Sequence, residues 1–198
     1  MNTSKLLFEL PQLHQYAAAY SYENHFSKSE IDQLNQAWEA NNQETATVTG
    51  GNETVNSGIR RSSVVTIAPN QQELSWFYKK LSDLVLKCNQ ECYGFDLHGI
   101  YEPIQIIGYE TGDFFEWHAD YGNGYSSNRK LSVSVQISSP DQYEGGELQF
   151  MVNKQVISVP KTEGTVVIFP SYIMHRVNKI TKGERRSVVC WISGPPFK

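Results

Sequence analysis

The second half of the chain is a succession of short strand-like segments separated by turns, and this pattern restricts the fold more than any other feature of the sequence. In residues 131–137, apolar side chains alternate with polar ones: Leu131, Val133, Val135 and Ile137 against Ser132, Ser134 and Gln136. Such alternation places the two kinds on opposite faces of a strand. Glycine-bearing turns at 144–146, 161–164 and 182–184 divide the segments that follow. Evenly spaced strands of this kind predict an antiparallel sandwich or jelly roll.

Before residue 100, helical patterns dominate. Ser27 and Glu30 form a capping-box pattern, and Asn70 and Glu73 form a second one. Apolar residues at helical spacing follow each pattern: Ile31, Leu34, Ala37 and Trp38 after the first, and Leu74, Phe77, Leu81, Leu84, Val85 and Cys88 after the second. The segment 41–57 between them is rich in Asn, Thr and Gly and predicts a flexible loop.

Together these patterns predict an α+β fold. We expect a double-stranded β-helix, that is, a jelly-roll or cupin-like antiparallel sandwich, with the N-terminal helices packed on one sheet. A chain of 198 residues suits one domain. We expect that domain to span 1–198, with 1–100 as a mainly helical support region and 101–198 as the jelly-roll core.

Composition narrows the classes of partner. The net charge of -4 and the lack of a basic stripe argue against nucleic-acid binding. No run of eighteen apolar residues exists, and the apolar stretch within residues 1–9 is too short for a signal peptide. We therefore expect no membrane contact and a cytoplasmic location. Three cysteines cannot all pair with one another, and Cys88 and Cys92 lie in a helical pattern, which favours reduced thiols over a metal site.

Four residues carry the strongest chemical signal. His118 and Asp120 are separated by one alanine, so on a strand their side chains point to the same face. A second imidazole from His175 would complete a set of two histidines and one carboxylate, which holds Fe(II) on one side and leaves three coordination positions open. An isolated His-x-Asp pair is more often a surface or core pair than a ligand set. Arg185, ten residues after His175, adds a guanidinium suited to bidentate binding of a carboxylate.

From about residue 60 to residue 192, the chain resembles the Fe(II)/2-oxoglutarate-dependent dioxygenases, in particular their prolyl 4-hydroxylase-like branch. The motifs that carry the resemblance are residues 105–109 (QIIGY), 112–120 (GDFFEWHAD), 143–148 (YEGGEL), 175–177 (HRV) and 181–185 (TKGER), and Trp191. The resemblance implies that His118, Asp120 and His175 hold iron. It also implies that Arg185 and Tyr109 bind the distal carboxylate of 2-oxoglutarate.

Two details of the resemblance concern the type of reaction. The interval of ten residues between His175 and Arg185 is typical of the prolyl hydroxylase branch, whereas the nucleic-acid demethylases have a pair of arginines six residues apart. Asp120 is a carboxylate, and the halogenating relatives have a small residue at that position. Hydroxylation is therefore the expected outcome.

The alternation of the strands suggests further residues of the site. Ser132 and Gln136 are candidate co-substrate contacts, although a solvent-facing strand explains their polar face equally well. Trp191 is predicted to face the same cavity as Arg185, because the two lie an even number of residues apart. Gln105, Ile107 and Tyr109 likewise share a face, while a core tyrosine with a satisfied hydroxyl is the alternative for Tyr109. The context of Glu147 favours a bend of the strand at Gly145 and Gly146 over a role in binding.

The resemblance implies an Fe(II)-dependent dioxygenase that hydroxylates an unactivated C–H bond and converts 2-oxoglutarate and dioxygen to succinate and CO2, with ascorbate (vitamin C) as a candidate reductant. The favoured substrate is a prolyl residue in a peptide or protein, and the alternative is a free amino acid or other small molecule. Polar loops at 41–60 and 121–128 are candidates to close over the substrate, and Arg61 faces either the substrate or the sheet edge.

Two other classes of function stay open for this sequence, a non-catalytic jelly-roll binding module and a zinc-dependent hydrolase. The sequence leaves the oligomeric state open.

Overall fold

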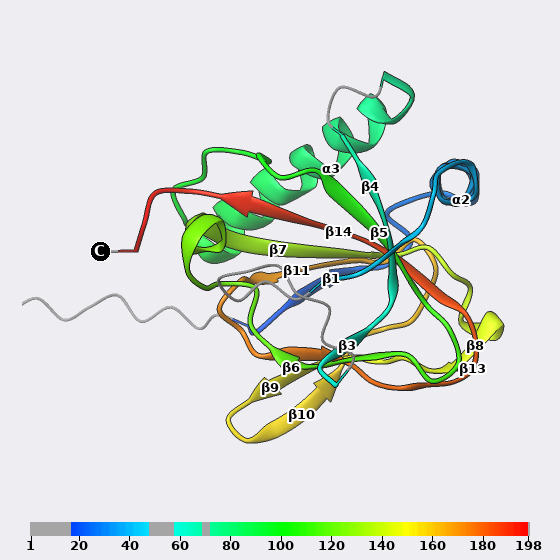
Figure 1. Cartoon of the computed structure of the whole chain (residues 1–198). Coiled ribbons are helices and arrows are strands. Elements are labelled where there is room, and N and C mark those ends of the chain that lie inside the picture. Colours follow the sequence, from blue (N-terminus) through cyan, green and yellow to red (C-terminus); the bar gives the residue numbers. More distant parts are fainter. Residues whose placement is uncertain (1–16, 48–57, 69–71, 198) are drawn as a thin grey trace, which may run out of the picture.

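The computed structural model describes residues 17–47, 58–68 and 72–197, and its β-strands form two main sheets (Figure 1). The seven-stranded sheet has the order β1-β11-β7-β14-β5-β4-β2, and the five-stranded sheet the order β10-β9-β12-β6-β3. The first comprises β1 (Tyr20–Tyr22), β11 (Val166–Pro170), β7 (Arg129–Gln136), β14 (Arg185–Ser193), β5 (Ile104–Tyr109), β4 (Ser63–Ile67) and β2 (Glu44–Thr45). The second comprises β10 (Gln155–Ser158), β9 (Leu148–Val152), β12 (His175–Val177), β6 (Phe114–His118) and β3 (Arg60–Arg61). A separate pair, β13 (Ile180–Gly183) and β8 (Tyr143–Gly145), completes the β structure, and all strand pairs are antiparallel.

Two α-helices, α2 (Lys28–Ala40) and α3 (Ser75–Cys88), cover the outer face of the seven-stranded sheet (Figure 1). Their apolar residues share one core cluster with Leu131, Val133 and Val135 of β7 and with Ile137, the residue after β7. Short helical turns lie at Gln72–Leu74 (η1), Asn89–Tyr93 (η2), Gly124–Asn128 (η3) and Pro140–Gln142 (η4). The prediction of a jelly roll with helices packed on one sheet is confirmed.

The capping box predicted at the start of α2 is present. The Ser27 side chain accepts a hydrogen bond from the Glu30 backbone, and the Glu30 side chain accepts one from the Ser27 backbone. Glu30 also forms an ion pair with Lys80 of α3 at 2.8 Å, which ties the two helices together. Asn70 of the second predicted box lies outside the described residues, and α3 begins at Ser75 after a 3-10 turn.

Short strands in the first hundred residues are the main feature that the sequence patterns did not predict. The loop prediction at 41–57 was wrong at Glu44–Thr45, where β2 pairs with β4, while residues 48–57 lie outside the described residues. Within the predicted loop 121–128, Gly124–Asn128 forms a 3-10 turn. Segments of two to five residues contain too few positions for a periodicity, so their pairing partners decide their structure.

All three cysteines are unpaired, and Cys88 and Cys190 are buried. Among the described residues, no helix combines the length and the apolar character that a membrane span requires.

Candidate metal centre and co-substrate pocket

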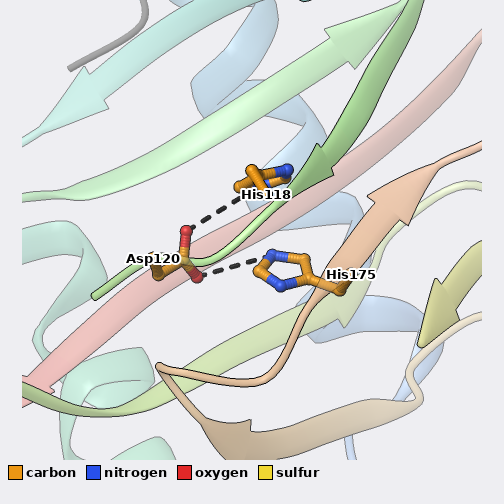
Figure 2. A group of neighbouring side chains, drawn as sticks. All are labelled: His118, Asp120 and His175. Carbon is orange, nitrogen blue, oxygen red and sulfur yellow. Dashed lines mark ion pairs between the residues drawn. The ribbon is translucent and has the colours of Figure 1, made fainter. Parts of the chain in front are cut away.

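His118, Asp120 and His175 converge between the two sheets (Figure 2). One potential ligand atom from each residue lies within 4.8 Å of the others. His118 at the end of β6 and His175 at the start of β12 are directly paired across the strands, with ring centroids 4.2 Å apart. The carboxylate of Asp120 faces both rings, 3.7 Å from His118 Nε2 and 3.6 Å from His175 Nε2. Two histidines and one carboxylate at this spacing fit a single divalent metal ion.

Asp120 reaches this position from outside the strand, which corrects the expectation that it continues the strand of His118. β6 ends at His118, and the next residues turn. The backbone N–H groups of Asp120 and Tyr121 both donate to the carbonyl oxygen of Ser171 at 2.9 Å. These two hydrogen bonds hold the turn beside the segment that leads to His175. The turn, and not the alternation of side chains along a strand, therefore brings the carboxylate to the imidazoles.

The hydrogen bonds of the two imidazoles orient them for metal binding. Nδ1 of His118 lies 2.7 Å from the carbonyl oxygen of Glu116, and Nδ1 of His175 lies 2.9 Å from that of Ile173. A carbonyl only accepts, so each Nδ1 carries the proton. Each Nε2 then has its lone pair free toward the shared centre, as in metal sites where a carbonyl fixes the tautomer.

The charge states also favour a metal. Burial, followed by the neighbouring His175, lowers the pKa of His118 to about 3, so its ring is neutral at physiological pH. Burial by itself raises the pKa of Asp120, but His175 and His118, aided by a hydrogen bond from Ser132, outweigh it and the pKa is lowered. A neutral imidazole and an ionised carboxylate are the forms that bind metal.

Ser132 contacts Asp120 directly. Its Oγ donates to Asp120 Oδ2 at 2.7 Å and lies 3.0 Å from the Ser171 hydroxyl. Strand alternation had left an inner and a solvent-facing position open for Ser132, and the structure places it inside, behind a metal-ligand candidate. This contact gives Ser132 a role in orienting the carboxylate, and a direct contact with the co-substrate stays a prediction.

Arg185 is the most unusual charge in the protein. Its side chain is 1% exposed, yet its hydrogen bonds are to neutral groups, Gln136 Oε1 at 2.8 Å and Ser187 Oγ at 3.2 Å. Within the described part of the chain, no carboxylate forms an ion pair with it. Burying an unpaired charge is costly, so this guanidinium implies an anionic ligand. Gln136, predicted as a co-substrate contact, holds the guanidinium in place.

One pocket contains Arg185, Tyr109 and the three metal-ligand candidates. Alternate residues of β14 line it, namely Arg185, Ser187, Val189 and Trp191, and so do alternate residues of β5, namely Gln105, Ile107 and Tyr109. The predicted faces of these strands are therefore confirmed. Tyr109 is buried opposite Arg185 across the strand pair, and its ring centroid lies 5.7 Å from the guanidinium carbon.

The sequence patterns missed two supporting groups. The Phe115 ring stacks on His118 with centroids 3.5 Å apart, and the Arg60 guanidinium carbon lies 4.8 Å from the centre of the Phe115 ring. The guanidinium carbon of Arg129 lies 3.8 Å from the centre of the Trp191 ring, and Arg129 forms an ion pair with Glu102. Arg129 also donates a hydrogen bond to the backbone carbonyl of Asp120 at 3.2 Å. Ideal alternation along β6 would put Phe115 and His118 on different faces of the strand. The sequence pattern therefore gave no signal for this stack.

Comparison with known proteins agrees with the site. The model of the 2OG-Fe(II) oxygenase superfamily matches residues 104–193. A PKHD-type hydroxylase of Shewanella sp. (strain MR-7) is 30% identical over 183 residues, which cover 85% of this chain and 75% of that protein. The chain belongs to the 2OG-Fe(II) oxygenase superfamily. PKHD-type hydroxylases of Gluconobacter oxydans (33% identical) and Psychrobacter sp. (28%) match 46% and 64% of this chain, and the chain covers only 43% and 55% of their length.

The fold also matches solved structures of the superfamily. A Pseudomonas putida prolyl-4-hydroxylase has a TM-score of 0.72 at 18% identity, with 90% of this chain and 93% of that chain covered. A prolyl hydroxylase from Trichoplax adhaerens has a TM-score of 0.74 at 14% identity, with 89% and 84% covered. At these identities the likeness concerns the fold alone.

Proposed function

We propose that this protein is an Fe(II)- and 2-oxoglutarate-dependent dioxygenase that hydroxylates an unactivated C–H bond, with a prolyl residue of a peptide or protein as its substrate. The observation that carries the proposal is the buried guanidinium of Arg185, which lacks a carboxylate partner in the described residues and lines the same pocket as His118, Asp120 and His175. A metal centre beside a site for an organic anion is what this chemistry requires.

In this proposal, His118, Asp120 and His175 hold the ferrous ion, and Arg185 and Tyr109 bind the distal carboxylate of 2-oxoglutarate. When bound, iron and 2-oxoglutarate supply the oxygen chemistry, in which dioxygen is consumed and succinate and CO2 are released. The protein contributes position and environment. Gln136 and Ser187 fix the guanidinium, and Ser132 fixes the Asp120 carboxylate.

The apolar part of the pocket limits the access of water. Ile107, Leu148, Phe169, Val177 and Val189 line it from both sheets. A low-polarity environment strengthens the ion pair between Arg185 and a carboxylate. It also protects a reactive centre from side reactions with solvent.

Support for a prolyl substrate comes from relatives. The Trichoplax adhaerens structure is a prolyl hydroxylase in complex with a hypoxia inducible factor peptide fragment, and its fold covers most of this chain. The curated relatives are PKHD-type hydroxylases. A free amino acid or other small molecule is the alternative substrate. A cytoplasmic location, ascorbate as reductant and a single domain spanning 1–198 belong to the same proposal.

The two other classes lack a role for Arg185. A zinc-dependent hydrolase could use the same three ligands around a water molecule, but it needs no buried guanidinium in the pocket. A jelly-roll binding module has no reason to bring the four groups together.

Succinate formation is the test of the proposed function. The protein is supplied with Fe(II), 2-oxoglutarate, oxygen and a panel of proline-containing peptides and free amino acids. We expect one or more members of the panel to raise succinate formation and to gain one oxygen atom by mass spectrometry. Zn(II) in place of Fe(II) serves as the control and should give no succinate. Lack of succinate with every member, or equal turnover with zinc, would reject the proposal.

A further inference from the structure

A second arginine in the pocket has an unsatisfied nitrogen. Arg60 of β3 lines the pocket together with the three metal-ligand candidates. Its Nε donates to Ser62 Oγ at 2.9 Å and its Nη1 to the carbonyl oxygen of Thr47 at 3.2 Å, while its Nη2 is buried and has no hydrogen-bond partner among the described residues. A buried N–H group of a charged side chain that makes no hydrogen bond is costly, so it points to a ligand that completes the site.

Three other arginines of the chain pair with carboxylates, whereas Arg176 donates a hydrogen bond to the neutral side chain of Gln149. Adjacent Arg61 pairs with Asp113 at 3.6 Å, and Arg186 pairs with both Glu39 and Glu184. Arg129 pairs with Glu102. Among the described residues, Arg60 and Arg185 are the two arginines that line the pocket, and neither has a carboxylate partner.

The two guanidiniums enter the pocket from different sheets. Arg185 belongs to the seven-stranded sheet and is held by groups of that sheet. Arg60 belongs to the five-stranded sheet, as His118 does, and its guanidinium carbon lies 4.8 Å from the centre of the Phe115 ring, which in turn stacks on His118. Arg60 is half-buried and bonded to exposed Thr47, so it lies nearer to solvent than Arg185. Arg60 is therefore the more accessible of the two guanidiniums that line the pocket.

We propose that Arg60 binds a carboxylate of the primary substrate. The proposal rests on the proposed function, in which Arg185 takes the distal carboxylate of 2-oxoglutarate and leaves Arg60 for a second anion. The two nitrogens that are already bonded fix the guanidinium, and Nη2 is left to donate a charge-assisted hydrogen bond. The carboxylate belongs either to the end of a chain, as in a free amino acid or a C-terminal residue, or to an acidic side chain next to the reacting residue.

Binding measurements without turnover test this proposal. The protein is loaded with Mn(II) and 2-oxoglutarate in the absence of oxygen, and probes are titrated by calorimetry. The first arm compares N-acetyl-proline with N-acetyl-proline amide, and L-proline with L-proline amide. The second arm compares the blocked peptides acetyl-Gly-Pro-Asp-amide and acetyl-Gly-Pro-Asn-amide. The variants are Arg60→Gln and Arg60→Lys, and Arg61→Gln is the matched control because Arg61 does not line the pocket.

In at least one pair, we expect the carboxylate probe to bind about tenfold or more tightly than its amide, since charge-assisted hydrogen bonds exceed neutral ones by about 1.4 kcal/mol or more. The arm in which this occurs identifies the source of the carboxylate. Arg60→Gln should reduce the ratio to near one, Arg60→Lys should restore part of it, and Arg61→Gln should leave it unchanged. Affinity for 2-oxoglutarate should change less than twofold in all variants.

Two results would overturn the proposal. The first is the lack of a carboxylate preference in every pair with the wild-type protein, including the case in which no probe binds. The second is an Arg60→Gln variant with weakened 2-oxoglutarate affinity and an unchanged probe ratio, because the guanidinium would then serve the co-substrate. Failure of the proposed function itself is seen separately, as a wild-type protein that does not bind 2-oxoglutarate.

Discussion

The three metal-ligand candidates are oriented by different hydrogen-bonding groups. His118 and His175 are oriented by backbone carbonyls, whereas Asp120 is oriented by the Ser132 hydroxyl. Groups that orient a ligand affect metal affinity without touching the metal. Such effects can be measured one residue at a time.

Replacing Ser132 by alanine should weaken Fe(II) binding by about tenfold, because the Asp120 carboxylate loses the hydrogen bond that orients it. The measurement is an anaerobic titration of Fe(II) into the metal-free protein. Ser134→Ala is the control, since Ser134 lies on the same face of β7 and lines the pocket. Equal losses in the two variants would show that the bond to Asp120 has no special role.

Replacing Arg185 by glutamine should weaken 2-oxoglutarate binding by about a hundredfold or more, because a carboxylate in a buried site then lacks its charge partner, at a cost of about 3–5 kcal/mol. Calorimetry on the Mn(II)-loaded protein measures the affinity. Arg186→Gln is the control, because Arg186 is the next residue of the strand and pairs with Glu39 and Glu184. Near-normal affinity of the Arg185 variant would reject its assignment.

The sequence predicted those site residues whose spacing follows strand geometry. Arg185, Trp191 and Tyr109 were placed on the correct faces because residues two apart point the same way. Arg60 was not predicted, because its place in the pocket depends on the pairing of β3 with β6, in which it lies opposite Phe115. Pairing across strands cannot be read from the periodicity of either one.

Among the elements, the turn after β8 shapes the Arg185 end of the pocket. Gly145 and Gly146 both have positive φ, 78° and 63°. A Cβ on Gly146 would lie 2.3 Å from Ile180 Cδ1 and 3.1 Å from Arg185 Cδ. Only glycine combines this backbone angle with this close approach. The bend predicted from Gly-Gly-Glu is therefore present, and it allows the Arg185 side chain to pass.

Gly146→Ala should lower the free energy of unfolding by about 1–3 kcal/mol more than Gly124→Ala does, because both have a similar positive φ but only Gly146 lacks space for a methyl group. Urea denaturation followed by circular dichroism measures both. A comparable loss in the two variants would mean that backbone angle alone, rather than crowding at Ile180 and Arg185, sets the cost.

Across the whole molecule, the buried ionisable groups of the site make stability depend on pH. The folded-state pKa of His118 is about 3, below its ordinary value of 6.5. Between these two values the unfolded chain binds more protons than the folded one, so stability falls as the pH is lowered. Asp120 acts in the same direction, since its pKa is also lowered and its contribution is lost only at more acidic pH.

We therefore expect the metal-free protein to lose stability steadily as the pH is lowered from about 6.5 toward 4. Urea unfolding at a series of pH values measures the slope, and His118→Gln provides the comparison because it removes the titrating group. The variant should show a shallower dependence over this range. An identical slope in both proteins would mean that His118 is not buried as a neutral ring.

The order of the strands in the whole fold could not be predicted from the sequence. The alternation of β7 and the capping box of α2 depend on neighbouring residues, so they could be recognised locally. Strand β1, in contrast, is three residues long and pairs with β11 from the far end of the chain. Such pairings are decided by tertiary packing, which the local pattern does not contain.

The stoichiometry of Fe(II) binding tests most directly whether the three side chains form one metal centre. Anaerobic equilibrium dialysis in the presence of 2-oxoglutarate would count the ions bound per chain for the wild-type protein and for His175→Ala. We expect one ion per chain in the wild type and an affinity at least a hundredfold weaker in the variant. A wild-type protein that binds no Fe(II), or a variant that binds it equally well, would contradict the account.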